Sequence, residues 1–161
     1  MRTVQHTQME IGEVRIEDIA LNPKSRDDIP ALLMGLQHLY RDKGIRKALF
    51  DLLDQHILPV KDQQNSRPSM ELWQILAMGV LKQGLGCNYD QLHEFINEHR
   101  MIRKFLGHSC TSDDYQYHLQ TAIENVELLT PELLVEVFRL VGESGHKVAR
   151  KKAWRALAQS L

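Results

Sequence analysis

The sequence predicts an all-α protein: a multi-helix bundle containing a helix-turn-helix-like unit, with an extended N-terminal arm and a basic C-terminal tail. Two observations lead to this prediction. Beyond residue 27 the apolar residues recur at intervals of three and four, which is the period of an amphipathic helix. Between these patterns stand the glycines, prolines and capping residues that end one helix and begin the next.

A chain of 161 residues has the usual size of a single domain and can bury a real core. Its formal net charge is −1, so no global field indicates a nucleic-acid partner, and the placement of the charges has to be considered instead. Only the tail, 146–161, is strongly biased, because it holds cations and no acid. The cations are Lys147, Arg150, Lys151, Lys152 and Arg155.

Cellular location follows from the cysteines and from the absence of long apolar runs. Cys87 and Cys110 are far apart and form no Cys-x-x-Cys pair, so the sequence indicates neither a disulfide framework nor a zinc knuckle and fits reduced thiols. The N-terminus lacks the apolar core of a secretion signal, and the longest apolar run is too short to span a bilayer. We therefore expect a soluble, cytoplasmic protein that does not bind membranes.

The first half of the chain divides into three parts. Residues 1–26 form an extended arm, in which Val14 and Ile16 alternate with charged neighbours but have no partner strand nearby. Residues 27–56 form a helical pair, with one helix from about 28 to 41 and a second, after Gly44, to about Gln55. Residues 57–68 are a polar linker with prolines near both ends.

Residues 69–145 form the main helical domain. The stretch "MELWQILAMGVLKQ" is apolar nearly all the way round and belongs in the middle of a bundle. Gly84 and Gly86 end this helix, and Asn88 with Gln91 has the form of a capping box for the next one. The buried face of that next helix consists of Leu92, Phe95 and Ile96.

Three further helices complete the domain. The stretch "EHRMIRKFLG" places Ile102, Phe105 and Leu106 on one side and Arg100, Arg103 and Lys104 on the other. Ser112, Asp113 and Asp114 mark the start of another helix, which runs to Val126. Thr130 and Pro131 start the last helix, whose core stripe is Leu133, Leu134, Val137, Phe138 and Val141.

Enzyme chemistry has little support in the sequence. It holds no Gly-rich phosphate loop, no Gly-x-Ser-x-Gly elbow and no His-Glu-x-x-His pair. The histidines and cysteines match no standard metal site, and solvated or capping histidines explain them better. Asp113 and Asp114 suit a helix first turn better than a catalytic pair. We therefore expect no catalytic residue, no metal site and no cofactor in this chain.

Two basic features suggest DNA. The stripe of Arg100, Arg103 and Lys104 could neutralise phosphates, although a solvated helix face is the simpler alternative. The cations of the tail could track a nucleic-acid backbone, and an ordinary solubilising end is the alternative there. The helix after the glycine turn also carries Asp90, Glu94 and Glu98, and acids repel phosphates. That helix is therefore not an obvious reader of bases.

The stretch "RPSMELWQILAMGVLKQGLGCNYDQLHEFINEHRMIRKFLG" resembles the N-terminal domain of bacterial insertion-sequence transposases of the DDE, ribonuclease-H-like class. In that family a proline-started apolar helix is followed by a glycine turn, a helix of the "YDQLHEFINEH" type and a closing "RKFLG". The preceding "SRDDIPALLMGLQHLY" is similar to the opening of the ISNCY group. The resemblance runs from about Ile11 to Lys152.

The resemblance implies that this region binds double-stranded DNA at the terminal inverted repeats of a mobile element and helps to assemble a synaptic complex. Within this interpretation we expect phosphate contacts from Arg100, Arg103, Lys104 and the Lys147–Lys152 arm, and base contacts from Asn88, Gln91 and His93, while the helix that enters the groove stays open. The family's chemistry resides in a following domain, where three acids hold two divalent metal ions such as Mg²⁺. This sequence continues only as "AWRALAQSL" and contains no candidate for the first of those acids, so we expect it to be catalytically inactive by itself.

Three interpretations remain open at this stage. The first is sequence-directed DNA binding by the N-terminal portion of a transposase. The second is an interaction protein that associates with full-length transposase, or with itself as a homo-oligomer, and regulates transposition. The third is a remnant of a decayed element with no present role.

Overall fold

The structure, a computed structural model, describes residues 4–5, 11–61, 70–109 and 113–143. Within these ranges it contains seven α-helices, a short 3-10 helix and no strand, which confirms the predicted all-α bundle. In order the elements are η1 (Ile16–Asp18), α1 (Asp28–Arg41), α2 (Lys43–Lys61), α3 (Leu72–Leu85), α4 (Tyr89–Glu98), α5 (Arg100–Phe105), α6 (Leu119–Val126) and α7 (Pro131–Glu143).

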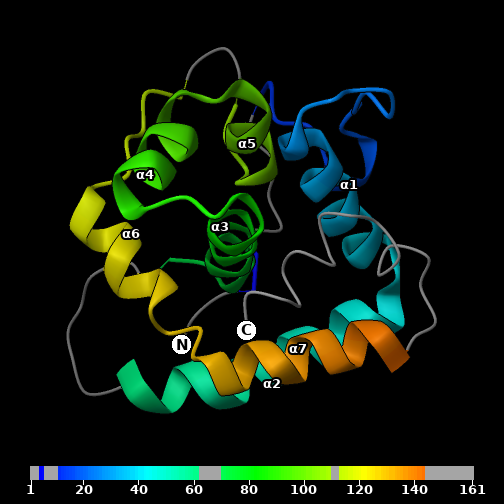
Figure 1. The fold of residues 1–161 in the computed structure, drawn as a ribbon, viewed down its shortest axis with the longest axis vertical. Helices are drawn as coiled ribbons and strands as arrows, with labels where there is room; N and C mark the ends of the chain where they lie inside the picture. Colours follow the sequence, from blue (N-terminus) through cyan, green and yellow to red (C-terminus); the bar gives the residue numbers. More distant parts are fainter. Residues whose placement is uncertain (1–3, 6–10, 62–69, 110–112, 144–161) are drawn as a thin grey trace.

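Helix α3 is the centre of the bundle, as its sequence predicts. Figure 1 shows it almost end-on, with α4 and α5 above it, α6 and α1 on opposite sides, and α2 with α7 below. All of its residues from Ile75 to Leu81 are buried, and so are Leu72 and Trp73. The Trp73 indole Nε1 donates to the carbonyl oxygen of Phe105 at 2.6 Å, which satisfies its polar atom in the core.

Two glycines of α3 allow neighbouring elements to approach its backbone closely. A Cβ added at Gly84 would lie 2.5 Å from a methyl group of Leu32 in α1, and one at Gly79 would lie 2.2 Å from a methyl of Leu129. Gly84 was predicted to end α3, but it is a residue of that helix. Its hydrogen side chain is required by packing, and the left-handed turn is made by Gly86 alone.

Helix α2 is longer than the sequence indicates. It continues to Lys61, so residues 57–61, which were assigned to the linker, are helical; residues 62–69 lie outside the described ranges. The reason is the buried stripe of Leu49, Leu53 and Ile57, whose spacing of four continues past the predicted end. This stripe lies on the same helix that packs along α7 (Figure 1).

The N-terminal arm is packed against α1. Ile16 and Ile19 are buried, and between them the chain forms the single turn η1 instead of the strand-like conformation suggested by its alternating pattern. The side-chain amide of Gln37 in α1 donates to the carbonyl oxygens of Ile16 at 2.8 Å and of Ile19 at 2.9 Å. Burial of Ile16 and Ile19, together with the hydrogen bonds of the Gln37 amide, therefore holds this part of the arm against α1.

Candidate nucleic-acid interface

The corner between α3 and α4 is made by three residues of defined geometry. Gly86 has φ +60°, the left-handed conformation that favours glycine, and its N–H bonds back to the carbonyls of Lys82 and Gln83. Asn88 then caps α4: its Oδ1 accepts from the N–H of Gln91 at 2.8 Å, and the Gln91 side chain accepts from the N–H of Asn88 at 3.1 Å. The predicted capping box is confirmed.

The capping box occupies two of the three side chains expected to contact bases. Asn88 and Gln91 are exposed, but each uses its side-chain oxygen to satisfy a backbone N–H at the start of α4. The third, His93, points back into the protein and donates from Nε2 to the carbonyl oxygen of Tyr117 at 2.8 Å. All three side chains therefore have structural partners within the chain.

The outward face of α4 is acidic. Asp90, Glu94 and Glu98 follow one another at intervals of four, and all three are exposed. Intervals of four place residues along one side of a helix, so the three carboxylates form a stripe. Such a stripe repels a phosphate backbone, and this argues against α4 as the element that enters a groove.

The three cations of helix α5 differ in their exposure and in their partners. Arg100 is exposed and Lys104 is half-buried. The third cation, Arg103, has a side chain only 13% exposed and lies against residues 113–115. Its guanidinium donates to the carbonyl oxygens of Tyr115 at 2.8 Å and of Asp113 at 3.3 Å. The predicted stripe is therefore divided: Arg100 is exposed, Lys104 is half-buried, and Arg103 holds a loop.

That loop, residues 113–118, replaces the first turns of a predicted helix. We expected Asp113 and Asp114 to start the helix, but α6 begins only at Leu119. The reason is that Asp113 has other partners. Its Oδ1 accepts from the N–H of Tyr115 at 2.9 Å, and its other oxygen accepts from Nδ1 of His108. Paired in this way, Asp113 forms an Asx-type turn and does not cap a helix.

His108 connects the carboxylate of Asp113 to the hydroxyl of Tyr117. Its Nε2 lies 2.6 Å from that hydroxyl, and the tyrosine is 3% exposed. Burial alone would raise the pKa of Asp113, but the N–H of Tyr115, His108 and the Arg103 guanidinium together lower it below its usual value. Burial raises the pKa of Tyr117, so this hydroxyl stays protonated. Asp113, His108 and Tyr117 thus form a hydrogen-bonded chain of side chains that stabilises the loop conformation.

The sequence analysis missed Asn97, the residue that fixes the other end of the loop. It is buried and pairs with both polar groups of the Tyr117 backbone. A signal was available: His93 and Asn97 are four residues apart, beside the buried Leu92 and Ile96, so two polar side chains share the inner face of α4. Polar groups on a buried face need partners, and both of these use Tyr117.

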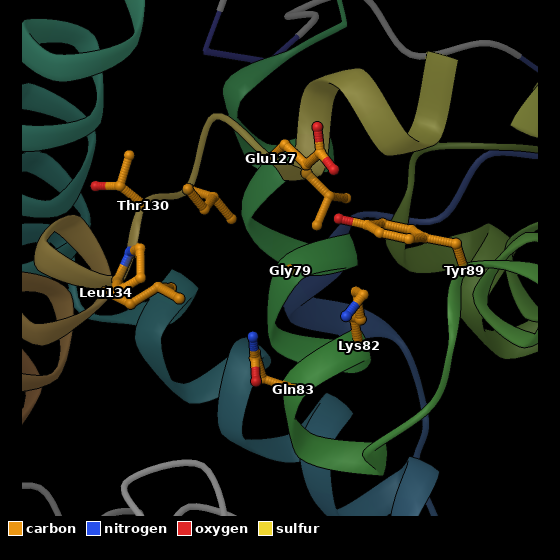
Figure 2. A pocket seen from close by; sticks show the side chains of 10 residues that line it. Gly79, Lys82, Gln83, Tyr89, Glu127, Thr130 and Leu134 are labelled. Atoms are coloured by element: carbon orange, nitrogen blue, oxygen red, sulfur yellow. The ribbon is translucent and has the colours of Figure 1, made fainter. Parts of the chain in front are cut away.

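A separate pocket lies where α3 meets the connection between α6 and α7. Its volume is about 260 Å³ and its lining includes Gly79, Leu129 and Leu134. Figure 2 shows Lys82, Tyr89 and Glu127 on one side of it and Thr130 with Leu134 on the other. The amino group of Lys82 stands 4.7 Å from the centre of the Tyr89 ring, so its charge already has an aromatic partner.

The tail cations Lys147, Arg150, Lys151 and Lys152 lie outside the described residues. Across the described ranges, no three His, Cys, Asp or Glu side chains are grouped so that they could hold a metal ion. Nor does any helix in those ranges combine the length and apolar character needed to cross a membrane.

Comparison with protein-family models, with curated proteins and with solved structures finds no match to this chain. The candidate interface therefore rests on the residues and their geometry.

Proposed function

We propose that this bundle is the DNA-binding portion of an insertion-sequence transposase, which binds the terminal inverted repeats of a mobile element in the cytoplasm. Strand cleavage and transfer, with their Mg²⁺, belong in this proposal to a separate catalytic domain. The observation that carries the proposal is a pair of cations on α5, the exposed Arg100 and the half-buried Lys104, on the helix from which Arg103 holds the 113–118 loop.

The geometry favours α5 and the 113–118 loop over α4 as the surface that meets DNA. Arg100 and Lys104 are four residues apart, so they lie one above the other on the same side of the helix, about 6 Å apart along its axis. No ion pair within the described residues neutralises either of them. The acidic stripe of α4, in contrast, is turned to solvent and would repel the backbone.

The test is fluorescence anisotropy with duplexes copied from the DNA that flanks the gene and with scrambled duplexes, across a salt series. We expect tighter binding to the flanking sequence and a steep loss of affinity with salt. A logarithmic slope near −4 would correspond to roughly four to five neutralised phosphates. Equal and weak binding to both duplexes would contradict the proposal.

The charge-reversal variant should be Arg100→Glu with Lys104→Glu. Arg103 is unsuitable, because its loss would also release the loop. We expect the double variant to weaken binding and to lower the magnitude of the salt slope by about 2. The control is Lys43→Glu, an exposed cation on α2, which lies on the far side of α3 from α5 (Figure 1). Lys47 is left unchanged because it pairs with Asp51 at 2.6 Å. The control should bind as wild type.

A second candidate, association with full-length transposase, is favoured by the acidic stripe of α4. Three exposed carboxylates in one line suit a cationic protein surface better than DNA. In the apolar stripe of α7 the described side chains of Leu133, Leu134 and Val137 are buried, and Val135 is the exposed large apolar side chain among the described residues of this helix. Asp90→Lys with Glu94→Lys should abolish co-sedimentation with full-length transposase if this candidate is right, and DNA binding should persist.

A further inference from the structure

Tyr115 is an exposed aromatic side chain held in one orientation. It is 53% exposed, whereas Tyr117, two residues later, is 3% exposed. Its ring is stacked on His108, with 5.6 Å between the ring centres and 9° between the planes. The edge contact with the Tyr117 ring, at 5.0 Å and 86°, supports it from a second side. One face of the ring is thus packed on His108, and more than half of the residue's surface meets solvent.

The backbone of Tyr115 is fixed as well. Its N–H donates to the carboxylate of Asp113 at 2.9 Å, and its carbonyl accepts from the guanidinium of Arg103 at 2.8 Å. A ring with few rotatable bonds, on a backbone held at both polar groups, loses little conformational entropy when it binds a partner. An isolated exposed tyrosine needs no explanation, but one held by His108, Arg103 and Asp113 is preorganised for a contact.

One cation of α5, Arg103, contacts the backbone of Tyr115, and the other two are its near neighbours in the same helix. Arg103 reaches Tyr115 from α5, and Lys104 is the next residue while Arg100 is one helical turn earlier. Spacings of three and four residues place Arg100 and Lys104 within one helical turn of Arg103, the residue that holds the loop. An exposed aromatic ring combined with cations from a neighbouring helix is the arrangement that proteins use to bind unpaired nucleotides.

We propose that Tyr115 is a stacking platform for an unpaired nucleobase, whose flanking phosphates are held by Arg100 and Lys104. This inference rests on the proposed DNA-binding function and deepens it, because it names the form of DNA that the surface prefers: a duplex with a frayed or single-stranded end. Every base has a π-face, so the platform is tolerant of sequence. Sequence preference must then come from other contacts.

The experiment compares a blunt duplex with the same duplex carrying a five-nucleotide single-stranded overhang. The overhang contains 2-aminopurine, a fluorescent adenine analogue that is quenched when it stacks. The variants are Tyr115→Ala and Tyr115→Phe, with Val135→Ala on α7 as a matched control, because Val135 is also 53% exposed. Circular dichroism melting establishes that each variant is folded.

We expect wild type, Tyr115→Phe and Val135→Ala to prefer the overhang duplex and to quench 2-aminopurine. Tyr115→Ala should lose roughly 5- to 100-fold in affinity for the overhang duplex, together with the quenching, and should keep its affinity for the blunt duplex. A Tyr115→Ala variant that still prefers the overhang, or that loses equally on both probes, would overturn the platform.

The wild-type protein separates the two proposals. If it binds the blunt duplex and gains nothing from the overhang, the DNA-binding function stands and the stacking platform is wrong. If it binds neither duplex at any salt concentration, the DNA-binding function fails and the platform fails with it.

Discussion

The side-chain amide of Asn97 pairs with the backbone of Tyr117 as a second strand would. Its Nδ2 donates to the Tyr117 carbonyl at 3.1 Å, and its Oδ1 accepts from the Tyr117 N–H at 2.8 Å. One buried side chain on α4 thereby satisfies both polar groups of a loop residue 20 positions later. This pair attaches the 113–118 loop, and with it Tyr115, to the helical core.

Replacing Asn97 with alanine should destabilise the protein by about 1–3 kcal/mol, because it leaves the buried N–H of Tyr117 without a partner. Urea denaturation followed by circular dichroism measures the change. The control is Glu98→Ala, the exposed neighbour on the same helix, which should stay within about 0.5 kcal/mol of wild type. Similar small effects for both variants would show that the pair does not stabilise the fold.

Substitutions of Asn88 test whether its side chain caps α4 or contacts DNA bases. Asn88→Ala removes the acceptor for the Gln91 N–H and should cost about 1 kcal/mol of stability. Asn88→Asp keeps an acceptor at the same place and should be as stable as wild type. Because the side chain serves the cap, we expect both variants to retain wild-type DNA affinity by anisotropy. A loss of affinity in both, with Asn88→Asp fully stable, would instead indicate a base contact.

Gly84 should not tolerate a methyl group. Alanine there would place its Cβ 2.5 Å from a fully buried methyl of Leu32, so despite better helix propensity we expect a loss of about 1–3 kcal/mol. Gly44→Ala is the control, because its Cβ would meet only Asp42 Oδ1 at 3.4 Å, and it should be neutral or slightly stabilising. Thermal melts of both variants make the comparison.

The clash explanation at Gly84 has its own check. In the double variant Gly84→Ala with Leu32→Ala the added methyl fills part of the space that the leucine leaves. The double variant should therefore lose less stability than the sum of the two single losses. Strictly additive losses would mean that the two side chains do not compete for the same space.

The pH dependence of the free energy of unfolding should reveal the stabilising contribution of the Asp113 carboxylate. Its pKa is lowered in the folded state, so its contribution is fully present above the unfolded value of about 3.9 and is lost as pH falls through the folded value. Asp113→Asn should therefore be less stable than wild type by about 1–3 kcal/mol at pH 7. The difference should shrink as the pH falls below about 4, because the unfolded chain then takes up a proton on this carboxyl group before the folded protein does.

Urea denaturation at pH 7, 5, 4 and 3 measures this difference. Asp114→Asn, a change at the exposed neighbour, serves as control and should follow wild type at every pH. A gap between Asp113→Asn and wild type that persists unchanged at pH 3 would mean that the charge of the carboxylate does not stabilise the loop.

Most of the helices could be predicted from local signals. Asp27 marks the start of α1, and the apolar run predicts that α3 is buried. Asn88 with Gln91 predicts the cap of α4, and Thr130 with Pro131 predicts the start of α7. These signals act between residues at most four apart, so the sequence displays them directly. The errors are at α2, where Pro59 suggested an end, and at α6, where Asp113 suggested a start.

The sequence by itself therefore determined the all-α fold class, the order of the helices and which helix is central. Which polar side chains are free to meet a partner was decided by the tertiary structure. Arg100 and Arg103 look equivalent in the sequence, yet Arg103 is turned inward because α5 packs beside residues 113–115. Tyr115 and Tyr117 differ in the same way, since His108, Asn97 and His93 fix which one is buried. These contacts join residues 9 to 24 positions apart, and local patterns carry no information about them.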